Sequence, residues 1–252
     1  MNLTGCAAFV TGAASGLGRA TAVALHARGA HVLCYDRDET GAERTAAAVA
    51  GQGAGGDVLD ADAVTAALER AATLGPLRVV VNCAGIGTAK RVLGREGPMP
   101  LAEFERVVRV NLTGTFNVTR LAVAHIAAQE PLADGERGAV VMTASAAAFE
   151  GQLGQAAYAA SKGGIAALTL PLAREFAAFG IRVVTIAPGL FATPLLGELP
   201  PEVQASLAAA IPFPKRLGAA EEYAALAVHI CENLSLNGET IRLDGALRLP
   251  PR

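Results

Sequence analysis

Three side chains with complementary acid–base chemistry lie within one short stretch of the chain. Ser145, Tyr158 and Lys162 supply a hydroxyl, a phenol and an ammonium group in the segment SAAAFEGQLGQAAYAASK. Tyr158 and Lys162 stand one helical turn apart in an Ala-rich run, so we expect both side chains on one face of a helix. Ser145 follows the apolar run at 139–142, which predicts a buried strand that ends just before it. This arrangement could take a proton from an alcohol while a hydride leaves the alcohol carbon.

A glycine-rich turn, TGAASGLG at 11–18, lies between the first expected strand and the first expected helix. Glycines let the backbone approach a pyrophosphate closely, and the N-terminus of the following helix meets its negative charge. The spacing is GxxxGxG rather than GxGxxG, and such a turn could also be an ordinary connection between a strand and a helix. Its place in the first strand–helix unit favours dinucleotide binding.

The ends of the next strands carry further candidates for this dinucleotide site. Asp36 ends the second strand, where a carboxylate can accept from the adenosine ribose hydroxyls and repel a 2′-phosphate, which favours NAD over NADP. Arg37 could instead bind a 2′-phosphate, so NADP stays open. Asp57 and Val58 could contact the adenine, although Asp57 could also cap the helix expected near residue 60. The small residues NCAG at 82–85 follow the fourth strand and admit the ribose closely.

Tyr158 is the group that we expect to exchange the proton. A phenol has an unperturbed pKa of about 10 and is a poor base near neutral pH. The positive charges of Lys162 and of an oxidised nicotinamide favour the phenolate, so we expect the pKa of Tyr158 to be lowered. Tyr158 would then act as base in oxidation and as acid in reduction, while Ser145 holds the reacting oxygen. Taken singly, Tyr158 could be an interfacial aromatic residue, Lys162 a solvated residue on a helix and Ser145 a cap at a strand end. Together with the glycine-rich turn, the three residues favour catalysis.

The elements that must position these residues alternate along the chain. Apolar runs predict strands at 7–10, 31–35, 77–81, 139–142, 181–186 and 239–243, with a further short strand before Asp57. Helices are expected near 17–28, 39–50, 60–73, 101–129, 155–178 and 219–231. Continuously apolar strands indicate a parallel sheet covered on both faces. We therefore predict a single α/β domain over 1–252, a doubly wound Rossmann fold with strand order 3-2-1-4-5-6-7.

Two irregular segments, 86–100 and 189–213, follow strands at the sheet edge where such folds bind ligands. We interpret 189–213 as a substrate lid that contains a short amphipathic helix.

Composition excludes several classes of partner. The net charge of −2 favours neither a nucleic acid nor an anionic membrane as partner. No stretch resembles a membrane span or a secretory signal, and the first strand begins almost at once. The four cysteines show no ligand or disulfide spacing, so we expect free thiols in a reducing cytoplasm. The four histidines are scattered, and we expect no metal.

The order and spacing of these elements resemble the short-chain dehydrogenase/reductase family along nearly the whole chain. The matching elements are TGAASGLG, Asp36, Asp57-Val58, NCAG, Asn111, Ser145, Tyr158, Lys162 and Pro188-Gly189. Within the family, RVNLTGTFNVTRL, FEGQLGQAAYAASKGGI and LNGETIRLDGALRLPP are similar to the NAD-dependent type 2 3-hydroxyacyl-CoA dehydrogenases, also described as 17β-hydroxysteroid dehydrogenase type 10. The likeness departs at 86–100, where the corresponding insertion of that subfamily borders the substrate entrance.

The resemblance implies roles for individual residues. Asn111 would fix a water that links Lys162 to solvent, although an asparagine before a helix could also be only a cap. Lys162 would also bind the ribose hydroxyls. The substrate would be contacted by Ser145, Gln155 and Tyr158. Cofactor contacts are expected from Gly12, Ser15, Gly16, Leu17, Gly18, Asp36, Asp57, Val58, Asn82, Cys83, Ala84, Gly85, Tyr158, Lys162, Pro188, Phe191 and Thr193.

The resemblance also implies an activity and an assembly. The expected reaction is the NAD-dependent interconversion of (3S)-3-hydroxyacyl-CoA and 3-oxoacyl-CoA, a step of fatty acid metabolism. Alternatives are a hydroxysteroid or other small secondary-alcohol dehydrogenase and, from another class, an idle cofactor-binding scaffold protein. Members of the family are typically homotetramers, with helices near 101–129 and 155–178 at one interface and the C-terminal segment at another.

Overall fold

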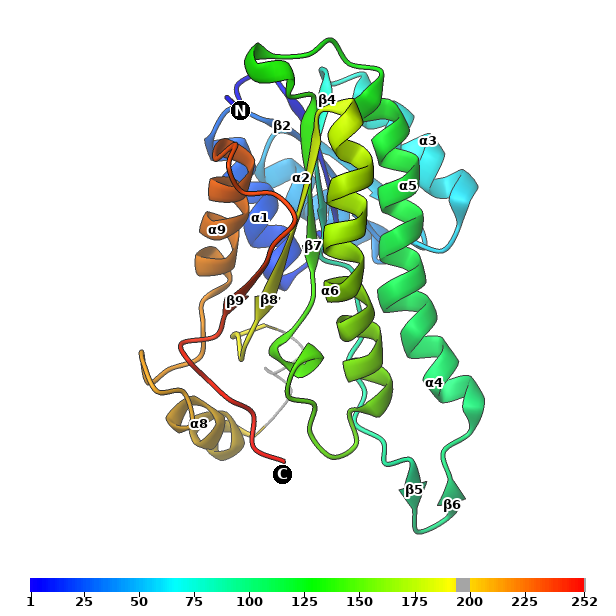
Figure 1. Cartoon of the computed structure of the whole chain (residues 1–252), viewed down its shortest axis with the longest axis vertical. Coiled ribbons are helices and arrows are strands. Elements are labelled where there is room, and N and C mark those ends of the chain that lie inside the picture. The colour runs from blue at the N-terminus through cyan, green and yellow to red at the C-terminus, as the bar shows by residue number, and fades with distance from the viewer. Residues whose placement is uncertain (194–199, 252) are drawn as a thin grey trace.

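The centre of the protein is a seven-stranded sheet in which neighbouring strands run parallel, as Figure 1 shows. The structure is a computed structural model that describes residues 1–193 and 200–251. The order β3-β2-β1-β4-β7-β8-β9 is the predicted 3-2-1-4-5-6-7 order, because β5 (Leu93–Gly94) and β6 (Gly97–Pro98) lie outside this sheet. The strands are β1 (Ala7–Thr11), β2 (His31–Asp36), β3 (Gln52–Gly55), β4 (Leu77–Asn82), β7 (Gly138–Thr143), β8 (Ile181–Pro188) and β9 (Thr240–Leu243).

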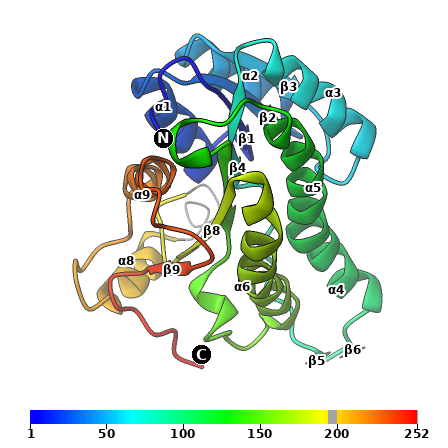
Figure 2. The same cartoon turned by 45° about the horizontal axis from the view of Figure 1, so that its top comes forward.

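Helices cover both faces of the sheet (Figure 2), as its continuously apolar strands require. On one face lie α1 (Gly16–Ala27), α2 (Glu39–Ala48) and α9 (Ala220–Glu232). On the other face lie α3 (Ala61–Ala72), α5 (Gly114–Ala127) and α6 (Ala156–Phe176). The arrangement is the expected doubly wound Rossmann fold. Shorter elements are α4 (Leu101–Val108), α8 (Pro201–Ala209) and the single turns η2 (Ala133–Gly135), η3 (Ala146–Ala148) and η4 (Ala177–Phe179).

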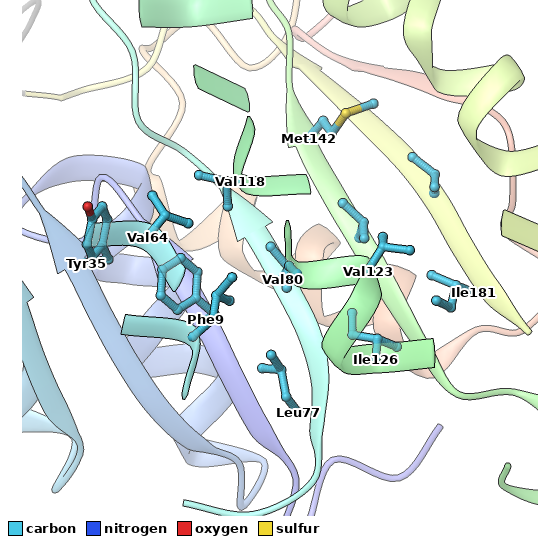
Figure 3. Packing of buried hydrophobic residues seen from close by; sticks show 14 of the residues in the cluster. Phe9, Tyr35, Val64, Leu77, Val80, Val118, Val123, Ile126, Met142 and Ile181 are labelled. Carbon is cyan, nitrogen blue, oxygen red and sulfur yellow. The ribbon is translucent and has the colours of Figure 1, made fainter. Parts of the chain in front are cut away.

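The core between the sheet and α3, α5 and α6 is built from branched and aromatic side chains (Figure 3). The rings of Phe9 and Tyr35, on adjacent strands, have centroids 5.4 Å apart. Val80 and Met142 continue the layer toward α5, where Ile126 is fully buried. Burial of such side chains contributes about 25 cal/mol per Å² of apolar area, so this layer fixes the strand ends that carry the site.

Strand β3 forms even though its sequence, QGAG, has low strand propensity. A Cβ at Gly53 would lie 2.8 Å from Glu43 Cα, and one at Gly55 would lie 2.7 Å from Glu39 Cβ. Because α2 packs this closely on the strand, glycine is required there, and the tertiary contact outweighs propensity.

Three features differ from the expected elements. The helix expected over 101–129 is interrupted by a π-helical turn, η1 (Arg109–Thr113). A two-stranded hairpin, β5 (Leu93–Gly94) with β6 (Gly97–Pro98), lies within the segment 86–100. In the segment of the predicted lid, α8 is a short helix whose apolar residues do not gather on one face as expected, and residues 194–199 lie outside the described residues.

Candidate active site

A cleft of about 340 Å³ opens at the carboxyl ends of the strands, where parallel sheets bind ligands. Most of the residues predicted to contact a cofactor line this cleft. They are Gly12, Ser15, Gly16, Leu17, Gly18, Asp36, Asp57, Val58, Cys83, Ala84, Gly85, Tyr158, Lys162, Pro188 and Thr193. The topology therefore brings together segments from both halves of the chain.

The glycine-rich turn leaves no room for side chains. Gly12 has a φ of +67°, and a Cβ there would lie 2.7 Å from the amide nitrogen of Ala84. A Cβ on Gly18 would collide with the carbonyl oxygen of Gly12. Ser15 is the N-cap of α1 but makes no side-chain capping hydrogen bond. The resulting cradle, with a helix N-terminus at its edge, fits the pyrophosphate of a dinucleotide.

The carboxylate of Asp36 is held in place by two backbone amides. Its Oδ2 accepts a hydrogen bond of 3.0 Å from Ala14 N, and its Oδ1 accepts one of 3.0 Å from Asp38 N. The first bond ties the carboxylate to the glycine-rich turn, so it faces the cleft at the end of β2. Arg37 is exposed and also lines the cleft.

Asp57 is not the cap of the following helix. Its Oδ1 accepts from Leu59 N at 2.9 Å, whereas the cap of α3 is Asp60, which accepts from two amides of the first helical turn. The alternative interpretation of Asp57 as a helix cap is therefore wrong. Val58 is buried, and its carbonyl oxygen accepts from Asn117 Nδ2 at 2.8 Å, which fixes this loop against α5.

The structure brings Ser145, Tyr158 and Lys162 together. Ser145 follows β7 directly; its Oγ accepts from Ala147 N at 3.1 Å, and its hydroxyl lies near enough to the phenol of Tyr158 to lower the pKa of that phenol. Lys162 Nζ lies 5.8 Å from the centre of the Tyr158 ring and donates to the carbonyl oxygen of Thr143 at 2.7 Å. Ser145 does not line the cleft itself, but it lies beside Tyr158, which does.

Burial is the main influence on the electrostatics of this group. Burial raises the pKa of Tyr158, and the hydrogen bond from Ser145 opposes that shift. Burial also lowers the pKa of Lys162 to about 8, because the ammonium group is desolvated. Among the protein groups, desolvation of the phenol is therefore the larger effect on the pKa of Tyr158, and the lowering expected from Lys162 together with an oxidised nicotinamide stays a prediction.

Asn111 lies in the π-helical turn η1 and is fully buried. Its Oδ1 accepts from Ile86 N at 2.8 Å, and its Nδ2 donates to Ile86 O at 2.9 Å and to Ser161 Oγ at 3.0 Å. Its side chain does not cap a helix, so that alternative is wrong. A Cβ on Gly85 would lie 3.1 Å from Asn111 Oδ1 and 3.5 Å from Lys162 Nζ, so both polar groups border one small space.

Besides Ser145, three predicted contact residues lie outside the cleft lining. Asn82 is buried, with its Nδ2 donating to Thr119 Oγ1 at 3.3 Å. Phe191 packs its ring against Gly218 in the core beside α9, so its side chain points away from the cleft. Gln155, at the N-terminus of α6, accepts from Gln152 N at 3.0 Å through its Oε1. Apolar burial decides the position of Phe191, a long-range hydrogen bond to α5 that of Asn82, and a local hydrogen bond that of Gln155.

Two residues of the site were not anticipated. Thr143 holds Lys162 through its carbonyl oxygen, while its Oγ1 donates to Asn82 O at 2.6 Å. Tyr223, on α9, places its hydroxyl 2.6 Å from Thr143 Oγ1 and is fully buried. The position of Thr143 at the end of an apolar run was a usable signal, whereas nothing in the sequence connects Tyr223 to the site.

Within residues 1–193 and 200–251, no group of three or more His, Cys, Asp or Glu side chains could hold a metal ion. The described helices include none with the length and apolar character needed to cross a membrane.

Comparisons with known proteins place these features in a family. A family model described as short chain dehydrogenase matches residues 6–204. The 3-hydroxyacyl-CoA dehydrogenase type-2 of Bos taurus is 50% identical, covering 99% of this chain and 98% of its own length. The (3R)-3-hydroxyacyl-CoA dehydrogenase of Rattus norvegicus is 34% identical and covers 98% of each chain. A crystal structure of the type-2 enzyme from Mycobacterium avium superimposes with a TM-score of 0.94 at 44% identity over 98% of both chains.

Proposed function

Because the chain belongs to the short-chain dehydrogenase family, and is therefore an oxidoreductase, we propose that it interconverts (3S)-3-hydroxyacyl-CoA and 3-oxoacyl-CoA with NAD as cofactor. The observation that supports the proposed reaction is that Ser145, Tyr158 and Lys162 lie together, with Lys162 Nζ 5.8 Å from the centre of the Tyr158 ring and the hydroxyl of Ser145 near the phenol. The substrate class rests on the similarity to the type-2 enzymes over nearly the full length of both chains.

The proposed preference for NAD rests on Asp36. Its carboxylate is fixed toward the cleft by Ala14 N, where it can accept from ribose hydroxyls and repel a 2′-phosphate. The glycine cradle around Gly12 and Gly18 fits the pyrophosphate. Chemically, bound NAD supplies hydride acceptance and donation, together with a positive charge that favours the phenolate of Tyr158.

Each catalytic side chain has a proposed task. Tyr158 takes the proton of the hydroxyl in oxidation and returns it to the carbonyl oxygen in reduction. Ser145, whose hydroxyl lies near the phenol, orients the reacting oxygen by hydrogen-bonding it. Lys162 holds its charge beside Tyr158 and binds ribose hydroxyls. Asn111, which borders the same small space as Lys162 Nζ, relays the proton to solvent through a water.

The proposal extends to the substrate side and the assembly. Gln155 would contact the acyl group, and the segment 189–213 would cover it as a lid. A homotetramer is supported by exposed apolar side chains on α4, α5 and α6, namely Leu101, Phe116 and Leu170. A cytoplasmic location is supported by four free cysteines, three of them buried. Size-exclusion chromatography with light scattering tests the tetramer, and cell fractionation tests the compartment.

A hydroxysteroid is the second candidate substrate. Phe149 and Leu153, in the loop between Ser145 and Tyr158, are 50% and 54% exposed and offer apolar surface to a rigid ring system. Two assays separate the candidates: oxidation of NADH with acetoacetyl-CoA, and reduction of NAD with a hydroxysteroid. Turnover in the first supports the acyl-CoA reaction, whereas turnover of the steroid alone would replace it. Absence of both, despite NAD binding by calorimetry, would favour an idle scaffold.

The stereochemistry needs its own test, because the rat relative named above acts on the opposite enantiomer. Separate assays with (3S)- and (3R)-3-hydroxybutyryl-CoA decide it. We expect NADH formation with the (3S) substrate, and a preference for (3R) would contradict the proposal.

A further inference from the structure

The loop that separates Ser145 from Tyr158 is bound to the C-terminal part of the chain by a network of charged side chains. Glu150, in this loop, forms a two-pronged ion pair with Arg242 of β9, with distances of 2.7 Å to Oε1 and 2.9 Å to Oε2. The side chains are only 22% and 24% exposed, so water screens this pair less than a surface pair. Planar, two-pronged pairing fixes orientation as well as distance.

Further contacts make Arg242 the centre of this network. Its Nε donates to Asp244 Oδ2 at 2.7 Å, and its guanidinium lies 5.2 Å from the centre of the Phe149 ring. Arg248 contacts both acids, at 3.2 Å from Glu150 Oε1 and 3.3 Å from Asp244 Oδ2. Hydrogen bonding to Arg242 is the main reason that the pKa of Glu150 is held below its usual value. Two arginines are thus balanced by two carboxylates.

The backbone of the C-terminal segment binds the same loop. Gln152 Nε2 donates to Pro250 O at 3.0 Å, and Leu153 N donates to Pro251 O at 3.1 Å. In Figure 1 the C-terminal end lies beside the loop that leads into α6. Side-chain and main-chain contacts therefore converge on residues 149–153.

The strand that carries Arg242 also pairs with a strand whose last residue lines the cleft. Arg242 lies on β9 opposite Ala187 of β8, and the next pair in the register is Leu243 with Pro188, which lines the cleft. Gly189 N donates to Leu243 O at 2.9 Å. One strand thus holds both the turn after β8 and, through Arg242, the loop that carries Ser145.

We propose that Arg242 is a positioning residue that acts through Glu150 to hold the Ser145–Gln155 loop, and with it the hydroxyl of Ser145, in place beside Tyr158. Arg242 touches neither of these catalytic side chains. Its effect on the reaction passes through the placement of Ser145, and a shift of about 1 Å in such a group can cost up to about a hundredfold in rate. The kinetic consequences of this inference rest on the proposed dehydrogenase function. The contact between Arg242 and the loop does not depend on the substrate and can be tested without it.

The first test measures kcat, KM and NAD affinity of Arg242→Met and Arg242→Lys. We expect kcat with acetoacetyl-CoA to fall at least about tenfold in Arg242→Met, with the Kd for NAD within about twofold of the wild type, since the cofactor cradle is built elsewhere. Arg242→Lys keeps the charge but loses the two-pronged geometry, so it should restore only part of the rate. The matched control is Arg106→Met, which removes an exposed pair with Glu103 and should leave kcat unchanged.

A second test separates positioning from general stability. In a Ser145→Ala background, Arg242→Met should lower kcat no further, because the group that it positions is gone. An undiminished additional loss would overturn the proposal. Amide hydrogen exchange over residues 145–155 gives a readout without turnover: exchange should accelerate in Arg242→Met and not in Arg106→Met. Unchanged exchange would also overturn it. If amide exchange over residues 145–155 behaves as expected but the wild type turns over no acyl-CoA, the proposed function is contradicted and the positioning role of Arg242 is not.

Discussion

Lys162 and Thr143 are joined by a hydrogen bond of 2.7 Å from the lysine Nζ to the threonine carbonyl oxygen. Thr143 is the last residue of β7, so the end of a strand fixes the cation of a helix residue. Its own side chain is fixed in turn by contacts with Asn82 and Tyr223. The position of the charge near Tyr158 therefore depends on the packing of the sheet against α9, and not only on the helix that carries both residues.

Tyr158→Phe removes the proposed proton-exchanging group while keeping the ring. We expect kcat to fall by about 10²–10⁴-fold, the usual contribution of general acid–base catalysis. NAD affinity by calorimetry and the melting temperature should change little, because the ring of residue 158 is kept and only its hydroxyl is removed. Retention of most of the rate would show that another group carries the proton.

The low pKa of Lys162 makes a prediction about stability and pH. Between its folded value of about 8 and its unfolded value of about 10, the unfolded chain binds more protons than the folded protein. This residue therefore makes the free energy of unfolding rise with pH across that window. Urea unfolding of the wild type and of Lys162→Met, each from pH 7.5 to 9.5, should show the difference growing in favour of the wild type. A constant difference would mean that Lys162 is not desolvated as described.

Asp36→Ala should narrow the preference for NAD over NADP. Removing the carboxylate removes repulsion of a 2′-phosphate, and we expect the ratio of kcat/KM for the two cofactors to shift by about tenfold or more, equivalent to about 1.4 kcal/mol. Arg37→Ala is the matched neighbour and should instead weaken any residual use of NADP. If Asp36→Ala leaves the ratio unchanged, Arg37 rather than Asp36 sets the cofactor choice.

The fold was predictable because its strands are continuous apolar runs separated by helical ones. Runs such as 7–10 and 139–142 contain no polar residue, which indicates a sheet covered on both sides. The glycine-rich strand β3 was harder to predict, because it exists through close packing of α2 and not through propensity. The π-helical turn at Arg109–Thr113 could not be read from the sequence, since its residues suit an ordinary helix equally well.

The site was predictable where a residue type must stand at a strand end, as for Asp36 and Ser145. It was not predictable where long-range contacts decide the side-chain direction. Phe191 packs against Gly218, and Tyr223 reaches Thr143 from a helix far away in the sequence. The desolvation that raises the pKa of Tyr158 was not predictable for a similar reason, because the degree of burial depends on the whole fold.

Two adjacent glycines in α6 give a last, sharply matched prediction. A Cβ on Gly163 would lie 3.7 Å from Ala148 O, which is ordinary contact, whereas one on Gly164 would lie 2.7 Å from Leu112 Cδ2.

Gly163→Ala should stabilise the protein by up to about 1 kcal/mol through helix propensity, with kcat retained. Gly164→Ala should gain less or lose stability, because Leu112 must move. Leu112 follows Asn111 in the π-helical turn, so kcat should fall as well. Denaturant unfolding and steady-state assays of the pair check this, and equal behaviour of the two variants would show that Leu112 does not hold Asn111 in place.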